Sequence, residues 1–232
     1  EETGAGGGDC ARLWLLEEPA AYGSPTWAPG GGRFAFVACP SPSGTFDGCT
    51  AQSGLYIADR EGNVTPLIPS VPWETPDSLN AVASSWSPDG DWIAFHGNGA
   101  LMLIRPDGSD LWGLVEGGEG LCPFGIAWSP NSEQIAWVGG TCMPDMPEVR
   151  DHVWLINRDG SNLRLLFQAP DVWLHGDIAW RPRGGGAVAV HYDDNRAYLI
   201  GVACADRGGC GPSDVEKLNH FPWDWVDWVY TP

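Results

Sequence analysis

A short pattern recurs four times along this chain and constrains its fold more than any other feature. Each copy starts with a tryptophan two residues before a proline, followed by a polar or glycine-containing turn. Seven or eight residues after the tryptophan comes an apolar triplet with alanine at its centre. A unit repeated at intervals of 42 to 59 residues predicts a repeat architecture. The copies are Trp27-Ala28-Pro29 with Phe34-Ala35-Phe36, Trp86-Ser87-Pro88 with Ile93-Ala94-Phe95, Trp128-Ser129-Pro130 with Ile135-Ala136-Trp137, and Trp180-Arg181-Pro182 with Val188-Ala189-Val190.

Each copy continues into further apolar runs. In the second copy, Leu101-Met102-Leu103 is followed by the turn Pro106-Asp107-Gly108 and by the run 111–115. Short apolar runs separated by Asp-Gly turns are typical of antiparallel hairpins, so each unit is predicted to be a four-stranded sheet. Such sheets bury both faces when they stack radially, which predicts an all-β β-propeller with negligible helix. The predicted units are residues 24–69, 82–116, 123–168 and 176–204.

The second unit, SSWSPDGDWIAF followed by LMLIRPDGSDLWGLV, resembles the WD-repeat-like units of the TolB-type propellers. The resemblance covers about residues 24–204. It implies a periplasmic or secreted bacterial propeller, and similar units precede the catalytic domain of prolyl oligopeptidases. TolB-type domains usually carry six or more blades, whereas four full units are visible here. The resemblance is fairly specific for the fold and almost uninformative about function.

The N-terminal run 11–16 indicates how the ring closes. It matches the fourth strands of the second and third units and stands at a similar distance before the next Trp-x-Pro motif. We therefore predict that 11–16 pairs outside the strand at 197–203 and completes the fourth blade, leaving 213–232 as a Trp-rich tail. In the alternative, 223–228 is the inner strand of a fifth blade.

Seven cysteines predict local disulfides. Three pairs bracket short segments, as loop-closing disulfides do, and none of the seven forms a C-x-x-C motif. Such disulfides favour an oxidising, extracytoplasmic compartment, the alternative being free thiols in the cytosol. Under the four-bladed prediction, the odd cysteine, Cys10, lies near Cys204 and Cys210 and competes for one of them. The predicted pairs are Cys39–Cys49, Cys122–Cys142 and Cys204–Cys210.

Charge and hydropathy exclude several partners. The chain has 12 basic and 30 acidic residues, a formal net charge of −18. Such a surface repels phosphate backbones and anionic headgroups, so no nucleic-acid role is expected. No apolar run approaches 18 residues, so no segment is expected to span a membrane.

Motifs for catalysis and metal binding are missing. There is no G-x-S-x-G, no P-loop and no H-E-x-x-H. The best acid/base candidate is His191-Tyr192-Asp193-Asp194, and a hairpin turn explains the same residues better. The loops that start at Asp107 and Asp159 lack the glutamate of an EF-hand at position twelve, so hairpin turns are favoured over calcium sites. We expect no catalytic residue, no metal and no cofactor.

Tryptophan is the remaining signal. The four Trp-x-Pro tryptophans are predicted to fill the wedges between blades. Four others, beside proline or acidic residues in loops or the tail, suit binding, because loop tryptophans stack on sugars or anchor protein interfaces. The main prediction is a non-catalytic extracytoplasmic propeller that binds a protein partner or belongs to a surface assembly. A carbohydrate-binding propeller is the alternative, and an enzyme such as a lyase or cyclase is a third class. The candidate binding residues are Trp73, Trp173, Trp223 and Trp225.

Overall fold

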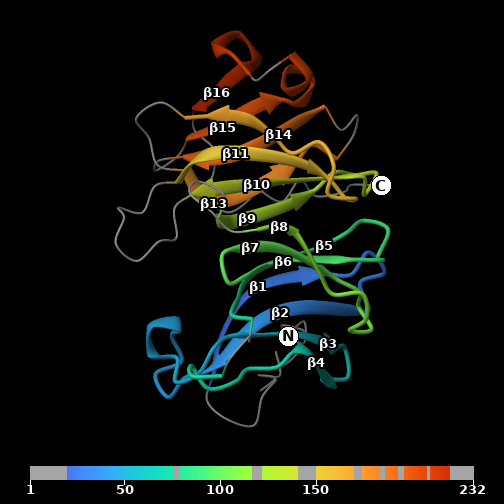
Figure 1. Ribbon diagram of the computed structural model, residues 1–232, viewed down its shortest axis with the longest axis vertical. Coiled ribbons are helices and arrows are strands. Elements are labelled where there is room, and N and C mark those ends of the chain that lie inside the picture. Colours follow the sequence, from blue (N-terminus) through green and yellow to red (C-terminus); the bar gives the residue numbers. More distant parts are fainter. Residues whose placement is uncertain are drawn as a thin grey trace, which may run out of the picture.

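The computed structural model consists of four antiparallel sheets of four strands each, stacked one after another (Figure 1). It describes residues 20–75, 79–116, 122–140, 150–169, 174–182, 186–192, 196–207 and 210–219. The only helices in these ranges are three short 3₁₀ helices: η1 (Phe46–Gly48), η2 (Val202–Arg207) and η3 (Pro212–Asp214). The all-β prediction and the predicted four blades are confirmed.

Each sheet is a meander, in which every strand pairs with its neighbours in chain order. Blade 1 contains β1 (Ala20–Trp27), β2 (Arg33–Pro40), β3 (Gly54–Asp59) and β4 (Val64–Ile68). Blade 2 contains β5 (Ala81–Trp86), β6 (Ile93–Gly97), β7 (Ala100–Ile104) and β8 (Trp112–Val115). Blade 3 contains β9 (Cys122–Trp128), β10 (Gln134–Gly140), β11 (Arg150–Asn157) and β12 (Arg164–Gln168). Blade 4 contains β13 (Leu174–Trp180), β14 (Ala187–Tyr192), β15 (Arg196–Gly201) and β16 (Val215–Asn219).

The Asp-Gly turns have the same geometry in blades 2 and 3. The amide of Gly108 donates to the carbonyl of Arg105, and Gly108 adopts φ +85°, a conformation that suits glycine. The carboxylate of Asp107 accepts hydrogen bonds from the amide and hydroxyl of Ser109, and Asp159 does the same for Ser161. These turns are thus three-residue hairpin loops with glycine in the left-handed conformation. Their aspartates accept hydrogen bonds from within the turn and stabilise it.

Alternation along the strands gives every blade two apolar faces. We call the face that carries the Trp-x-Pro tryptophan the tryptophan face, and the opposite face, with the central alanine of the triplet, the alanine face. Three hydrophobic clusters join the blades, and in each the alanine face of one blade packs on the tryptophan face of the next. Between blades 1 and 2, for example, Ala35 and Ile57 pack with Trp86 and Phe95.

The strand that completes blade 4 differs from the prediction. The outer edge of β15 is occupied by β16, in which Lys217 pairs with Tyr198 and Glu216 with Leu199. The run 11–16, predicted for this edge, lies outside the described residues. The strand 215–219 falls within the predicted tail 213–232; it is short and half polar, and no Asp-Gly turn links it to β15. Its link instead contains η2, η3 and the Cys204–Cys210 disulfide.

The described blades form an open series rather than a ring. The inner strands contact one another in the order β1, β5, β9, β13, and no comparable contact joins β1 to β13 within the described ranges (Figure 1). Blade 1 therefore has a tryptophan face, and blade 4 an alanine face, with no neighbouring blade among the described strands. No helix of the described residues is long and apolar enough to cross a membrane.

Candidate functional site

Two loops at one end of blade 1 form the candidate binding surface. They are residues 41–53, between β2 and β3, and residues 69–75, which follow β4. Both lie at the same edge of the blade, at the lower left of Figure 1. The Cys39–Cys49 disulfide, with its Cα atoms 5.7 Å apart, closes the base of the first loop. The surface is thus built on a covalently stapled loop.

Hydroxyl groups order the tip of the first loop. The hydroxyl of Ser41 donates to the carbonyl of Thr45 over 2.7 Å, and the hydroxyls of Ser43 and Thr45 are 2.9 Å apart. These bonds lead into η1, where the ring of Phe46 is 45% exposed. An apolar ring held on an ordered turn is suited to contact a partner, because little conformational entropy is lost on binding.

Trp73 lies on the second loop and is 52% exposed. Its carbonyl accepts a 3.1 Å hydrogen bond from the side-chain amide of Gln52, and the backbone amide of Gln52 donates to the carbonyl of Val71. Gln52 is itself buried, so it ties the two loops together from below. Phe46, Trp73 and the acidic residues Asp47 and Glu74 are together called the aromatic loop site.

The aromatic loop site is acidic. Asp47 and Glu74 are both exposed, and Arg60 is the single arginine or lysine between Arg33 and Arg105. Arg60 belongs to the β3–β4 turn at the other end of the strands, where its side chain donates to the carbonyl of Gly31. No basic side chain of these two loops therefore offsets the carboxylates.

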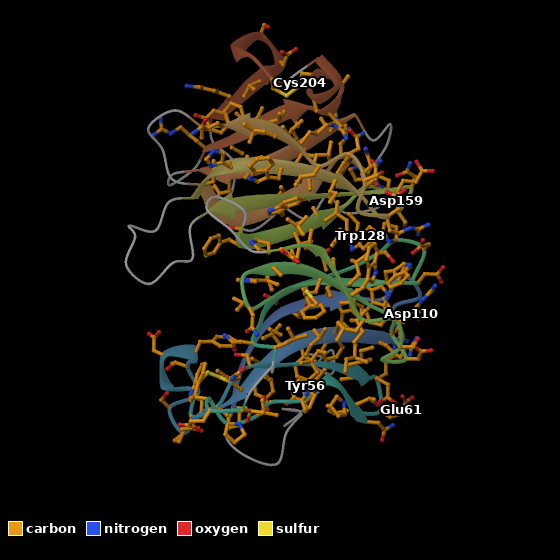
Figure 2. The ribbon with its side chains drawn as sticks, in the orientation of Figure 1. Tyr56, Glu61, Asp110, Trp128, Asp159 and Cys204 are labelled. Atoms are coloured by element: carbon orange, nitrogen blue, oxygen red, sulfur yellow. A yellow bond between two sulfur atoms is a disulfide. The ribbon has the colours of Figure 1, made fainter. Side chains whose placement is uncertain are left out.

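The opposite end of the blades carries the Asp-Gly turns, and it is internally paired. Figure 2 shows Glu61, Asp110 and Asp159 together along this edge. Here Arg105 lies 3.2 Å from Asp110 and stacks over the ring of Trp92 at 4.2 Å. Hydrogen bonds from Ser109 and Ser161 hold the pKa values of Asp107 and Asp159 below their ordinary range. Charges that satisfy one another make this edge a weaker candidate for ligand binding.

The structure covers only part of the predicted site. Of the four candidate binding tryptophans, Trp73 is described and exposed, and Trp173, Trp223 and Trp225 lie outside the described residues. His191 of the acid/base candidate lies on β14 with Nδ1 3.4 Å from a carboxylate oxygen of Asp177, while Asp193 and Asp194 are outside. Phe46 and the link through Gln52 were not predicted from the sequence, and the neighbouring Cys49 was the available signal for an ordered loop. Within the described ranges, no group of three or more His, Cys, Asp or Glu is placed to hold a metal ion.

Two predicted disulfides are present, Cys39–Cys49 and Cys204–Cys210, the latter with Cα atoms 4.9 Å apart. Cys10 and Cys142 lie outside the described residues, as does the side chain of Cys122, so the 122–142 pair and the pairing of Cys10 stay predictions.

One buried titratable group was not anticipated. His96, at the end of β6, accepts a 2.9 Å hydrogen bond at Nε2 from the amide of Gly99, and its ring lies edge-on to Phe124. Burial lowers the pKa of His96 to about 4, because the charged imidazolium loses its hydration. His96 is therefore neutral at pH 7.

Comparison with solved structures identifies the fold. TolB from Acinetobacter baumannii superposes with a TM-score of 0.57 at 15% identity, covering 89% of this chain and 45% of that one. A putative TolB from Agrobacterium tumefaciens gives 0.52 at 22% identity, covering 78% and 61%. The chain folds as a β-propeller similar to that of TolB.

A chain of a nidogen/laminin complex, also similar to this propeller, gives a TM-score of 0.55 at 14% identity over 86% of this chain and 64% of that one. The propeller thus spans between 45% and 64% of the length of these three solved chains. No family model and no curated protein sequence matches it. At these identities the likeness establishes the fold alone.

Proposed function

We propose that this propeller is a non-catalytic extracytoplasmic binding protein that docks a protein partner through the aromatic loop site. The observation that carries the proposal is Trp73, which is half exposed and yet held by the buried Gln52. Exposed aromatic anchors on ordered supports dominate the binding energy of many protein interfaces.

The charge of the site defines the chemistry of the partner. Asp47 and Glu74 are next to exposed aromatic rings in the sequence. An indole ring beside carboxylates attracts arginine and lysine side chains through cation–π and ionic contacts. The net charge of −18 favours the approach of a basic surface and opposes that of an acidic one. The partner is therefore a protein with an arginine- or lysine-rich segment.

Two disulfides support an extracytoplasmic location. Cys39–Cys49 and Cys204–Cys210 both close short loops, and such bonds persist in oxidising compartments. In this proposal the first of them also shapes the site, since it lies beneath η1.

A glycan is the second candidate ligand. Trp73 next to Glu74 has the composition of a sugar site, in which the ring stacks on a pyranose and the carboxylate accepts hydrogen bonds from its hydroxyls. Phe46 and the excess of acidic residues favour the protein partner. One experiment compares the protein partner with the glycan.

The experiment is a titration of intrinsic tryptophan fluorescence with two probe sets, basic peptides and neutral oligosaccharides. We expect arginine-rich peptides to change the emission, with glutamate-substituted peptides inactive and with Trp73→Ala abolishing the change. Trp112→Ala, which removes an exposed tryptophan of β8 away from the site, is the matched control and retains binding. A response to oligosaccharides alone would establish the glycan function instead. Peptide binding that survives Trp73→Ala would overturn the proposed site.

A further inference from the structure

β16 is the fourth strand that the hydrophobic core holds least. In blades 1 to 3, every fourth strand buries at least one apolar side chain. These side chains are Ile68 on β4, Leu114 and Val115 on β8, and Leu166 and Phe167 on β12. None of the described side chains of β16 is buried, and Glu216 and Lys217 are exposed. A strand with so few buried apolar contacts opens locally at low cost in free energy.

β15 is fixed in the core by contacts that do not involve β16. Its inner edge pairs with β14 along its whole length. The ring of Tyr198 lies edge-on to that of Phe167 on blade 3, with ring centroids 5.0 Å apart. Tyr198 and Ile200 also belong to the hydrophobic cluster that joins blades 3 and 4. β15 therefore does not need β16 to keep its place.

The connection between β15 and β16 is anchored at its two cysteines. The Cys204–Cys210 disulfide closes it, with Cα atoms 4.9 Å apart. Cys204 is 2% exposed in the cluster that joins blades 3 and 4, and the half-buried Cys210 packs against the same cluster. The amide of Cys210 also donates a 3.2 Å hydrogen bond to the carbonyl of Leu166 on blade 3. The disulfide thus ties the chain just before β16 to the core.

The segment from Cys210 to β16 is short and internally bonded. The amide of Gly211 donates to the carboxylate of Asp214 over 3.1 Å, and the amide of Asp214 donates to the carbonyl of Gly211 over 3.0 Å. These bonds belong to η3, which ends at the residue before β16. An anchored Cys210 therefore holds Val215 opposite Ile200, the pair from which the ladder between β15 and β16 starts.

We propose that the Cys204–Cys210 disulfide is a redox switch for β16: the oxidised form holds the strand on β15, and reduction releases it. Reduction removes the constraint on a short loop, so the unpaired state of the connection and of β16 gains conformational entropy. The small apolar burial of β16 does not offset this gain. The released form presents the outer edge of β15 with unpaired N–H and C=O groups, where another strand can pair.

Reduction is a thiol–disulfide exchange with a dithiol reductant. A thiolate of the reductant attacks the sulfur of Cys210, the more exposed of the two cysteines, and the bond to Cys204 breaks. The Cys204 thiolate takes up the proton that the attacking thiol lost. The second thiol of the reductant then attacks the mixed disulfide, gives its proton to the sulfur of Cys210 and leaves the reductant as a disulfide. Two electrons and two protons thus pass from the dithiol to the two cysteines.

The Cys39–Cys49 disulfide lacks this arrangement. β3, which follows the loop that it closes, buries its residues from Gly54 to Ala58. Leu55 and Ile57 pack in the cluster that joins blades 1 and 2, so the core holds this strand with or without the disulfide. Removal of Cys39–Cys49 therefore frees a loop but no strand, which makes it the internal control.

The switch goes beyond the proposed function and does not depend on it. It lies on blade 4 at the top of Figure 1, and Figure 2 labels Cys204 there, whereas the aromatic loop site lies on blade 1 at the lower end. Peptide binding is measured with the disulfides intact, and the switch is measured without any ligand. The failure of one proposal therefore leaves the other unaffected.

The test is hydrogen–deuterium exchange of the protein before and after treatment with dithiothreitol, with the free thiols counted by alkylation. We expect the amides that join β15 and β16 to exchange roughly 50-fold faster after reduction, which is the loop-closure entropy of so short a disulfide loop expressed as a ratio of opening constants. The amides that join β14 and β15 should stay the slower set, because only β16 leaves. Reoxidation should restore slow exchange at β16.

Alanine variants assign the effect to one disulfide. Cys204→Ala with Cys210→Ala should show fast exchange at β16 without any reductant, whereas the matched control, Cys39→Ala with Cys49→Ala, should keep β16 protected until the reductant is added. Unchanged exchange at β16 after complete reduction would overturn the switch. Exchange of β14, β15 and β16 in a single step would also overturn it, because that result shows unfolding of the whole blade. If the alanine variant does not fold, reduction and reoxidation of the unaltered protein decide the question alone.

Discussion

Arg158 of blade 3 forms a 2.7 Å ion pair with Asp89 of blade 2, which joins turns 69 residues apart in the chain. The amide of Asp89 also donates to the hydroxyl of Ser132 in blade 3. The Trp-x-Pro turn of one blade is thereby attached to the next blade at the edge of their shared core. Partial burial opposes the ionisation of Asp89, but hydrogen bonds from Ser87 and Asp91 and the charge of Arg158 keep its pKa below the ordinary value.

A double-mutant cycle with Asp89→Asn and Arg158→Gln measures this contact. Since both side chains are about one-third exposed, we expect a coupling of about 0.5–1 kcal/mol in the free energy of urea unfolding at low salt. The coupling should shrink in molar salt. Because the folded-state pKa of Asp89 is lowered, its contribution is present at neutral pH and is lost as the pH falls through that pKa. A coupling unaffected by salt would contradict an ionic contact.

Acidification should destabilise the propeller through His96. Its folded-state pKa is about 4 against an ordinary 6.5, so below pH 6.5 the unfolded chain binds a proton that the folded chain does not. Between pH 7 and pH 5 this removes about 2 kcal/mol from the free energy of unfolding. His96→Asn, which still offers Gly99 an acceptor, should lose correspondingly less over the same interval. If the free energy of unfolding of the unaltered protein and that of His96→Asn fall equally with pH, His96 is not the cause.

Removing the Cys39–Cys49 disulfide should destabilise blade 1. For a loop of this length, the double substitution to alanine is expected to cost about 3 kcal/mol, since the unfolded chain regains the entropy of the open loop. The same change should weaken peptide binding at the aromatic loop site, whereas removal of Cys204–Cys210 should leave binding unchanged. Non-reducing peptide mapping of the unaltered protein checks both pairs and also tests 122–142 and the partner of Cys10. Recovery of Cys39 and Cys49 as free thiols would refute the disulfide between them.

Tryptophans with different surroundings should differ in their contribution to stability. Trp128→Ala removes a buried ring and leaves the carbonyl of Ser85 without its indole donor, for an expected loss of about 3–5 kcal/mol in chemical unfolding. Trp73→Ala, on an exposed loop, should change stability by less than about 1 kcal/mol. Equal losses would mean that the ring of Trp73 is part of the core.

Local patterns along the chain were sufficient to predict the blades. Period-2 apolar runs, the Trp-x-Pro turns and the Asp-Gly turns act within about ten residues, so each hairpin follows from its own segment. The two short disulfides were predictable for the same reason, because their cysteines bracket single loops. Trp73 was predicted to lie in a loop, from its proline and glutamate neighbours, and it lies in the loop that follows β4.

Contacts between distant segments decided the rest. β16 pairs with the outer edge of β15 because the disulfide-linked connection returns the half-polar strand 215–219 to that edge. No local sequence pattern indicates this pairing. Trp27 has the same motif as Trp86, Trp128 and Trp180 but is exposed, because no preceding blade among the described strands packs against its ring. The ion pair of Arg158 with Asp89 and the low pKa of His96 likewise arise where blades meet. Sequence determined the blades of this propeller, and tertiary packing determined which faces are covered, because covering a face requires segments that only folding brings together.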